Sequence, residues 1–200
     1  MEINVEYELE NGYKLSNNET WESHFKDFAE KLMREYCIKV GKDEYNFLEL
    51  EFYFYSAEHQ DTVVYPRTCK AGQLFVHYSG FDIAFQTKCD NQSITQFGGI
   101  LVRSLFNAQT NEVIGGPLRC LIEVFNNQQG KPELGTKKNS IFCDSHEGTK
   151  CIGIKSSKKY RFVRKDYWNQ KDFKMKRGAY ENTKPVYKDK SYTYKFNQEG

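Results

Sequence analysis

Residues 47–55, Phe47-Leu48-Glu49-Leu50-Glu51-Phe52-Tyr53-Phe54-Tyr55, alternate between two classes of side chain. A period of two predicts a β-strand that places one face against a hydrophobic core. The pattern assigns Leu48, Leu50, Phe52 and Phe54 to the core face and Glu49, Glu51, Tyr53 and Tyr55 to the other. A carboxylate enclosed by aromatic rings suits general acid or base chemistry, whereas a solvated sheet face is the alternative for this Glu–Tyr side.

A second strand is predicted at residues 98–106, where Arg103 interrupts an otherwise apolar run. A guanidinium buried in such a strand needs a carboxylate or a bound anion as its partner. Arg103 is therefore predicted either to pair with Glu49, Glu51 or a phosphate, or to face solvent from an edge strand.

Helical periodicity is clearest over residues 19–37, where aromatic and aliphatic residues form one stripe and charged residues the other. Its start is expected at Asn18, or at a capping box formed by Ser16 and Glu19. His24 falls on the charged side and is expected to be solvated. A second, short helix is predicted to begin at Pro117, with Leu118, Leu121, Ile122 and Phe125 as its apolar stripe.

The remaining segments predict a hairpin and short strands. Residues 73–78 and 81–85 read as the arms of a hairpin with a Ser79-Gly80 loop, and 151–154 and 160–163 as two short strands. Residues 126–150 read as surface loop. Without strand–helix–strand periodicity, the order predicts a single α+β domain with a mostly antiparallel, curved sheet, an N-terminal amphipathic helix and a protruding hairpin.

Charge divides the chain, because residues 155–200 hold 14 of its 29 Lys/Arg but only 5 of its 27 Asp/Glu. Ten aromatic residues are interleaved with these cations, a mixture that fits nucleic-acid binding. The alternative is a peripheral segment whose aromatic rings pack on an acidic body. We therefore predict a domain over residues 1–164 and a basic, aromatic-rich extension over residues 165–200.

The same composition argues against several other classes of protein. The mean hydropathy is −0.77 and the apolar runs are too short to span a bilayer, so we expect no membrane association. Because the sequence shows no signal-like start, its six cysteines are expected to be free buried thiols and not disulfides. A zinc site at Cys143, His146 and Cys151 is the less favoured alternative, and we expect no metal or cofactor.

Six segments, taken in chain order over residues 16–164, resemble the alkyladenine (3-methyladenine) DNA glycosylase family. Glu49-Leu50-Glu51-Phe52-Tyr53 is similar to its Glu-x-Glu-x-Tyr strand, and Gly72–Tyr78 to the strand entering its aromatic hairpin. Ile100–Ser104 resembles its Val-Leu-Leu-Arg-Ala strand, and Gly116–Cys120 its Gly-Pro-x-Lys-Leu helix start. The last two similar segments are Lys150–Ile154 and Tyr160–Val163.

The resemblance implies a role for each candidate residue. Glu51 is expected to activate water against the glycosidic carbon of a flipped nucleotide, and Arg103 to orient that site. Tyr53, His59, His77 and Gln86 are expected to bind the extruded base. The implied DNA contacts are a wedge, Tyr78 or Phe81, and the cations Arg119, Lys158 and Lys159.

The chain departs from the family pattern in the hairpin. Ser79 stands where the family has its wedge tyrosine, and His77 where it has a pocket tyrosine. The expected function is excision of a damaged purine from double-stranded DNA by a monomeric, monofunctional DNA N-glycosylase, located in the cytoplasm with the nucleoid. A catalytically silent nucleic-acid-binding protein on the same fold, or a small-ligand or partner-binding domain, is the alternative.

Overall fold

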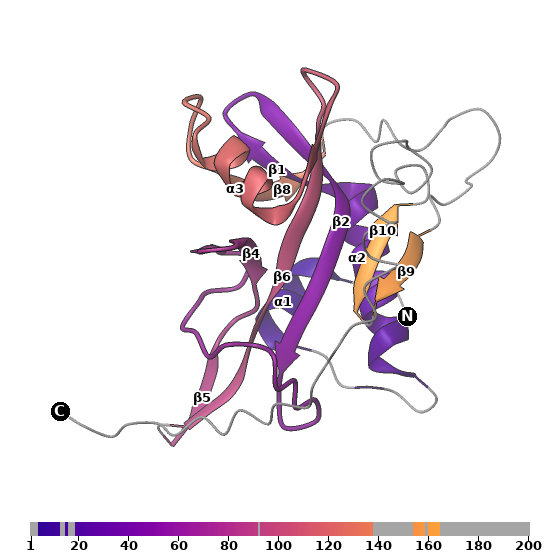
Figure 1. Ribbon diagram of the computed structural model, residues 1–200. Helices are drawn as coiled ribbons and strands as arrows, with labels where there is room; N and C mark the ends of the chain where they lie inside the picture. The colour runs from indigo at the N-terminus through magenta and orange to yellow at the C-terminus, as the bar shows by residue number, and fades with distance from the viewer. Residues whose placement is uncertain are drawn as a thin grey trace.

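The computed structural model describes residues 4–12, 15, 19–91, 93–137, 154–158 and 160–164 (Figure 1). Its helices are α1 (Val5–Asn11), α2 (Trp21–Glu35) and α3 (Pro117–Phe125). Its strands are β1 (Tyr36–Val40), β2 (Asp43–Tyr55), β3 (Leu74–His77), β4 (Gly80–Ala84), β5 (Lys88–Asp90), β6 (Ser93–Asn107), β7 (Glu112–Gly115), β8 (Glu133–Thr136), β9 (Ile154–Lys158) and β10 (Arg161–Arg164). The extension predicted at 165–200 and the candidate zinc residues lie outside the described residues.

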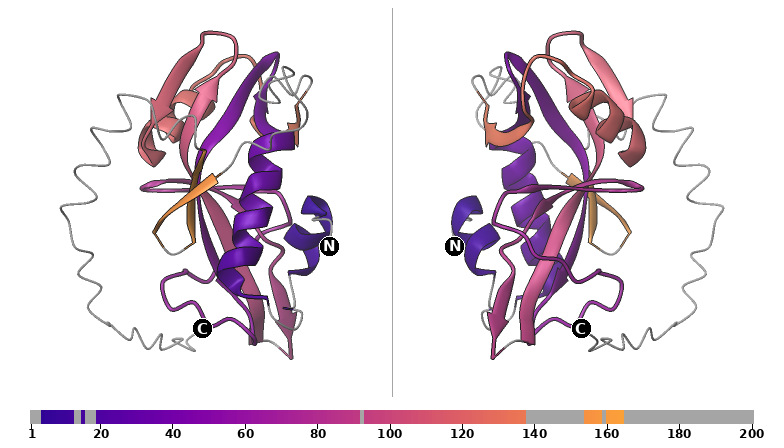
Figure 2. Two further views of the ribbon diagram at one scale, coloured as in Figure 1. Left: turned by 90° about the vertical axis from the view of Figure 1, so that its right-hand side faces the viewer. Right: turned by 90° about the vertical axis from the view of Figure 1, so that its left-hand side faces the viewer.

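All described strand pairings are antiparallel, and the main order is β3-β4-β6-β2-β1-β8. The long strands β2 and β6 form the spine of the sheet. On the side away from β6, β2 pairs first with β1 and then with β10. On the side away from β2, β6 pairs with β5, β4 and β7. The sheet curls, and α2 runs alongside the spine (Figure 2). The predicted α+β class is confirmed.

The core lies between α2 and the inner face of the sheet, which we define by Phe47, Leu50, Phe52, Phe54, Ile100, Val102 and Phe162. Phe25 stacks on Phe52 with ring centroids 4.9 Å apart, and Phe28 lies 5.6 Å from the same ring. Such aromatic pairs stabilise a core beyond the area that they bury. The aromatic stripe read from the sequence is therefore the helix face that packs on the sheet.

Helix α2 is shorter than predicted and starts at a different cap. Thr20 is the N-cap: its hydroxyl accepts from the Ser23 N–H at 3.1 Å, and the Ser23 hydroxyl accepts from the Thr20 N–H at 3.1 Å. The expected caps at Asn18 or Ser16–Glu19 are thus replaced by Thr20. Tyr36 and Cys37 belong to β1, where pairing with β2 and β8 takes over from helical periodicity.

We expect Thr20→Ala to lower the free energy of unfolding by about 1 kcal/mol, because the Ser23 N–H loses the Thr20 hydroxyl that accepts its hydrogen bond. Urea denaturation followed by circular dichroism measures the change. Thr62→Ala is the matched control, since Thr62 is exposed and outside the helices and strands. Equal stabilities for the two variants would contradict the capping role.

The prediction for His24 was wrong, because a helix that the sequence did not reveal covers it. His24 is 2% exposed, and its Nε2 lies 2.7 Å from Glu8 Oε2 on α1. Val5 and Leu9, one turn apart on α1, enter the same core. With only two apolar residues at helical spacing, α1 is too short to stand out as an amphipathic pattern.

The core face predicted for residues 47–55 was wrong at its start, because the pairing of β2 with β6 is irregular there. Phe47 pairs with Leu105 and Glu49 with Ser104, so Leu48 is an extra residue on β2. A bulge of this kind breaks the strict alternation of faces. As a result Phe47 occupies the main core, and Leu48 packs with Val163 in a second, separate cluster.

The structure also differs from the sequence predictions in the hairpin, in the third helix and in residues 126–150. The pair His77–Gly80 closes the hairpin, so its two-residue loop is Tyr78-Ser79 instead of Ser79-Gly80. Helix α3 begins at Pro117 as predicted, but it buries Cys120 and Val124 while Leu118 and Ile122 are about half exposed. Residues 133–136 form β8, which pairs with β1.

Cys37, Cys69 and Cys120 are buried thiols, as expected, whereas Cys89 is exposed. Cys89 lies on β5, whose one strand partner among the described residues is the outer end of β6.

Candidate functional site

Glu51 lies at the centre of a buried charge cluster on the face of the sheet opposite the core. Both carboxylate oxygens accept from Arg161 Nη2 at 2.8 Å, and Oε2 also accepts from Arg103 Nη1 at 2.8 Å. The Glu51 residue is 5% exposed and Arg161 is 6% exposed. An ionised carboxylate offers about four acceptor positions, so the two guanidinium groups use most of its capacity.

Glu49 extends the cluster along β2. Its Oε1 lies 3.4 Å from Arg103 Nε, and its Oε2 accepts from the Ser104 hydroxyl at 3.0 Å. Arg103 and Ser104 are adjacent on β6, yet both reach Glu49, because the β2–β6 pairing is irregular there. Of the two alternatives for Arg103, the paired one therefore holds. The solvated sheet face considered for Glu49 and Glu51 is excluded by their burial.

The strand register places Asp82, at the base of the hairpin, in one row with Glu51 and Arg161. Asp82 on β4 pairs with Leu101 on β6, Leu101 with Glu51, and Glu51 with Arg161. Residues directly opposite one another in antiparallel pairs point to the same face. We call this face, defined by Glu49, Glu51, Asp82, Arg103 and Arg161, the charged face.

Asp82 anchors a second network at the base of the hairpin. Its carboxylate pairs with Arg67, whose guanidinium lies 4.6 Å over the Phe75 ring. His77 Nε2 lies 3.2 Å from Asp82 Oδ1, and His77 Nδ1 lies 2.9 Å from the Ser79 hydroxyl. The hairpin tip is thus tied through side chains to the row that contains Glu51.

Tyr53 follows Glu51 on the charged face and is partly buried. Burial raises the pKa of Tyr53 above its ordinary value, and the negative charge of Glu51 raises this pKa further. The phenol therefore stays protonated at neutral pH and is available as a hydrogen-bond donor beside the carboxylate. The structure thus brings together three of the predicted site residues: Glu51, Arg103 and Tyr53.

Comparison with known proteins adds one relative. "Uncharacterized protein L759" of Acanthamoeba polyphaga mimivirus is 26% identical over 48% of this chain and 54% of its own length. The chain thus spans about half the length of this relative. No family model and no solved structure matches.

Two predicted base-binding residues do not reach the charged face. His59 Nδ1 lies 2.6 Å from the Phe54 carbonyl oxygen and Nε2 lies 3.1 Å from the Tyr160 hydroxyl. Its ring is 4.7 Å from Trp21 of α2, so it joins the aromatic residues on the helix side. The Gln86 side chain accepts from the Ala71 N–H and donates to the Thr87 carbonyl, which fixes the end of β4.

The two wedge candidates have opposite environments. Tyr78 is 90% exposed at the hairpin tip, whereas Phe81 is fully buried and lies 5.5 Å from the Phe125 ring. The difference follows from the loop position, because a Tyr78-Ser79 loop makes Phe81 an inward-facing residue of β4. The prediction of Phe81 as a wedge was therefore wrong, and Tyr78 is the exposed aromatic residue at this tip.

The predicted cations are only partly described. Arg119 is exposed on α3, beside a cavity of about 600 Å³ between that helix and β7. Lys158 ends β9 opposite Arg161, and its side chain, like the whole of Lys159, lies outside the described residues.

The main residue that the sequence reading missed is Arg161. It stands between Tyr160 and Phe162 in a segment that was read as a strand, and alternation places it on the face opposite Phe162. The argument that gave Arg103 a buried partner applies equally to Arg161. Arg67 and Asp82 gave no such signal, because their contact depends on how residues 63–72 fold over the sheet.

Among the described residues, no three His, Cys, Asp or Glu side chains are grouped closely enough to hold a metal ion. Nor is any helix of that part of the chain long and apolar enough to cross a bilayer.

Proposed function

We propose that the chain is a monofunctional DNA N-glycosylase that flips a damaged, alkylated or deaminated purine and hydrolyses its N-glycosidic bond. The contact between Glu51 and Arg103 on one buried sheet face carries the proposal. Water attacks the glycosidic carbon while Glu51 accepts a water proton, and the bonding electrons leave with the purine. Arg103 and Arg161 hold the carboxylate in one orientation, as a positioned base requires.

The hairpin supports an approach to double-stranded DNA. Tyr78 projects from a tip whose base, at Asp82, lies in the same row as Glu51. An exposed aromatic ring can fill the space that a flipped base leaves in the stack. Arg119 adds an exposed cation. In this proposal the protein acts as a monomer in the cytoplasm, where it associates with the nucleoid.

A second candidate is a nucleic-acid-binding protein that has no excision activity. It is favoured by the same carboxylate, because Glu51 is 5% exposed and accepts three hydrogen bonds from guanidinium groups. A general base must contact the water that it activates. The exposed Tyr78 would serve binding equally well in this case.

Base release separates the two candidates. Duplex oligonucleotides containing 1,N6-ethenoadenine, hypoxanthine or 3-methyladenine are incubated with the protein, and abasic sites are cleaved with alkali. We expect strand cleavage with the wild type and its loss with Glu51→Gln, because an amide cannot accept the water proton. Circular dichroism establishes that the variant is folded.

Binding is measured on the same duplexes by fluorescence anisotropy at two salt concentrations. We expect salt-sensitive binding and weaker binding of Tyr78→Ala, with the stability of this variant unchanged because the ring is exposed. Binding without any cleavage by the wild type would overturn the glycosylase in favour of the second candidate. Absence of binding at low salt would overturn both.

A further inference from the structure

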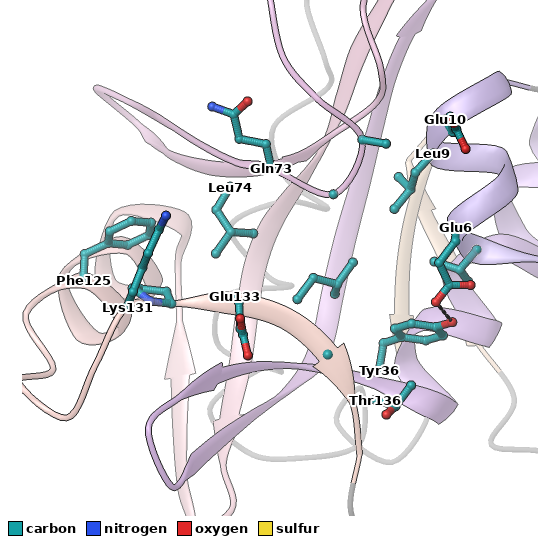
Figure 3. Close-up of a pocket in the computed structure, with 16 residues that line it drawn as sticks. Glu6, Leu9, Glu10, Tyr36, Gln73, Leu74, Phe125, Lys131, Glu133 and Thr136 are labelled. Carbon is teal, nitrogen blue, oxygen red and sulfur yellow. Dashed lines mark hydrogen bonds between the residues drawn. The ribbon is translucent and has the colours of Figure 1, made fainter.

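An open cavity of about 630 Å³ has no residue of the charged face in its described lining (Figure 3). Most of its lining comes from three segments that are distant in sequence: α1, residues 71–74 at the start of β3, and residues 131–136 of β8 and its approach. Tyr36 of β1 and Phe125 of α3 complete the lining. This volume is typical of sites that bind small molecules. We call it the α1–β8 cavity.

Its carboxylates stand on opposite walls. Glu6 and Glu10 come from α1, and Glu133 comes from β8 across the cavity (Figure 3). Glu10 and Glu133 are exposed, and their carboxylates have no hydrogen bond or ion pair within the described part of the chain. Lys131 is the one cationic residue among the described lining residues, so the lining is negative overall.

Apolar side chains lie between these walls. Leu9 of α1, Leu74 of β3 and Leu134 of β8 line the cavity. The Tyr36 hydroxyl donates to Glu6 Oε1 at 2.7 Å, which fixes one carboxylate at the edge of this apolar surface. A ligand that fits must therefore place uncharged carbon against the leucines and positive charge at both ends.

We propose that the α1–β8 cavity binds a linear aliphatic polyamine. Protonated amines at the two ends meet Glu10 and Glu133, and the methylene chain between them covers the leucine side chains. A single metal ion does not fit this distribution, since the described carboxylates are not grouped as metal ligands. The inference does not depend on the proposed glycosylase activity.

Isothermal titration calorimetry of the full chain with spermidine at low ionic strength tests the proposal. We expect saturable one-site binding, and about tenfold weaker binding for the double variant Glu10→Gln/Glu133→Gln, because two charge contacts are lost. Glu58→Gln is the matched control, as Glu58 is exposed and outside the cavity. No saturable binding by the wild type, or an equal loss in the control, overturns the proposal.

Ligand length tests the apolar surface separately. Binding of 1,6-diaminohexane is expected to be at least about tenfold tighter than that of ethylenediamine, because four additional methylene groups contact the leucines. Equal affinities would mean that charge alone attracts the ligand, and the proposed cavity would then be wrong. Thermal unfolding of each variant establishes that its fold is intact.

Discussion

Replacing Arg161 by methionine is expected to lower the free energy of unfolding by about 3 kcal/mol. The guanidinium is almost fully buried and holds both oxygens of Glu51 at 2.8 Å. Breaking a buried ion pair from one side leaves the other charge with too few partners, which costs about 3–5 kcal/mol. Because Arg103 still contacts Glu51 in the variant, we expect the lower end of this range.

Urea denaturation of the full chain measures this change, with Arg119→Met as the control. Arg119 is exposed, so its replacement is expected to change stability by less than about 0.5 kcal/mol. The double variant Glu51→Leu/Arg161→Met identifies the cause. If the stranded charge of Glu51 is responsible, the double variant is more stable than Arg161→Met alone. A loss below about 1 kcal/mol for Arg161→Met would refute the coupling.

Only part of the Glu51 ion-pair cluster could be predicted from the sequence. The strands that contain Glu51 and Arg103 were predicted because each is long and patterned, and burial of Arg103 by itself called for a carboxylate. The pairing of β10 with β2, which brings Arg161 to Glu51, joins residues 110 positions apart. The position of Arg161 between Tyr160 and Phe162 calls for a buried partner, but no local pattern shows that this partner is Glu51.

Local signals failed where tertiary contacts decide the outcome. The bulge at Leu48 moves Phe47 into the core, although alternation alone favours Leu48. Helix α1 became visible only through its partners, since Glu8 pairs with His24 and Leu9 lies in the common core. Likewise, a one-residue shift of the hairpin loop decides that Tyr78 is exposed and Phe81 buried.

The candidate site was therefore predictable in its centre and not at its edges. Glu51, Arg103 and Tyr53 lie on neighbouring, strongly patterned strands, and their side chains meet as the alternation requires. His59 and Gln86 lie beyond the ends of β2 and β4, where the path of the chain depends on contacts with α1 and α2. The direction of a side chain in such a segment does not follow from a period of two.

Gly98→Ala is expected to lower the free energy of unfolding by about 3 kcal/mol. Gly98 pairs with Phe54, and a Cβ at this position would collide with the Tyr53 carbonyl oxygen and lie 2.9 Å from Phe54 Cα. Both obstacles are backbone atoms of the central strand β2, so they cannot move aside as a side chain can. Forcing an extra methyl group into a packed region costs about 1–3 kcal/mol, and a rigid neighbour favours the upper end.

Gly135→Ala is the matched control for this prediction, because it makes the same substitution in another strand of the same sheet. Its Cβ would lie 2.9 Å from Lys39 Cδ, which belongs to a flexible side chain that can move away. We expect a loss of less than about 1 kcal/mol for the control, measured by the same urea denaturation. Equal losses would mean that the spacing between β2 and β6 is not fixed at Gly98. A larger loss for Gly98→Ala would instead show that this glycine lets β6 approach the strand that carries Glu51.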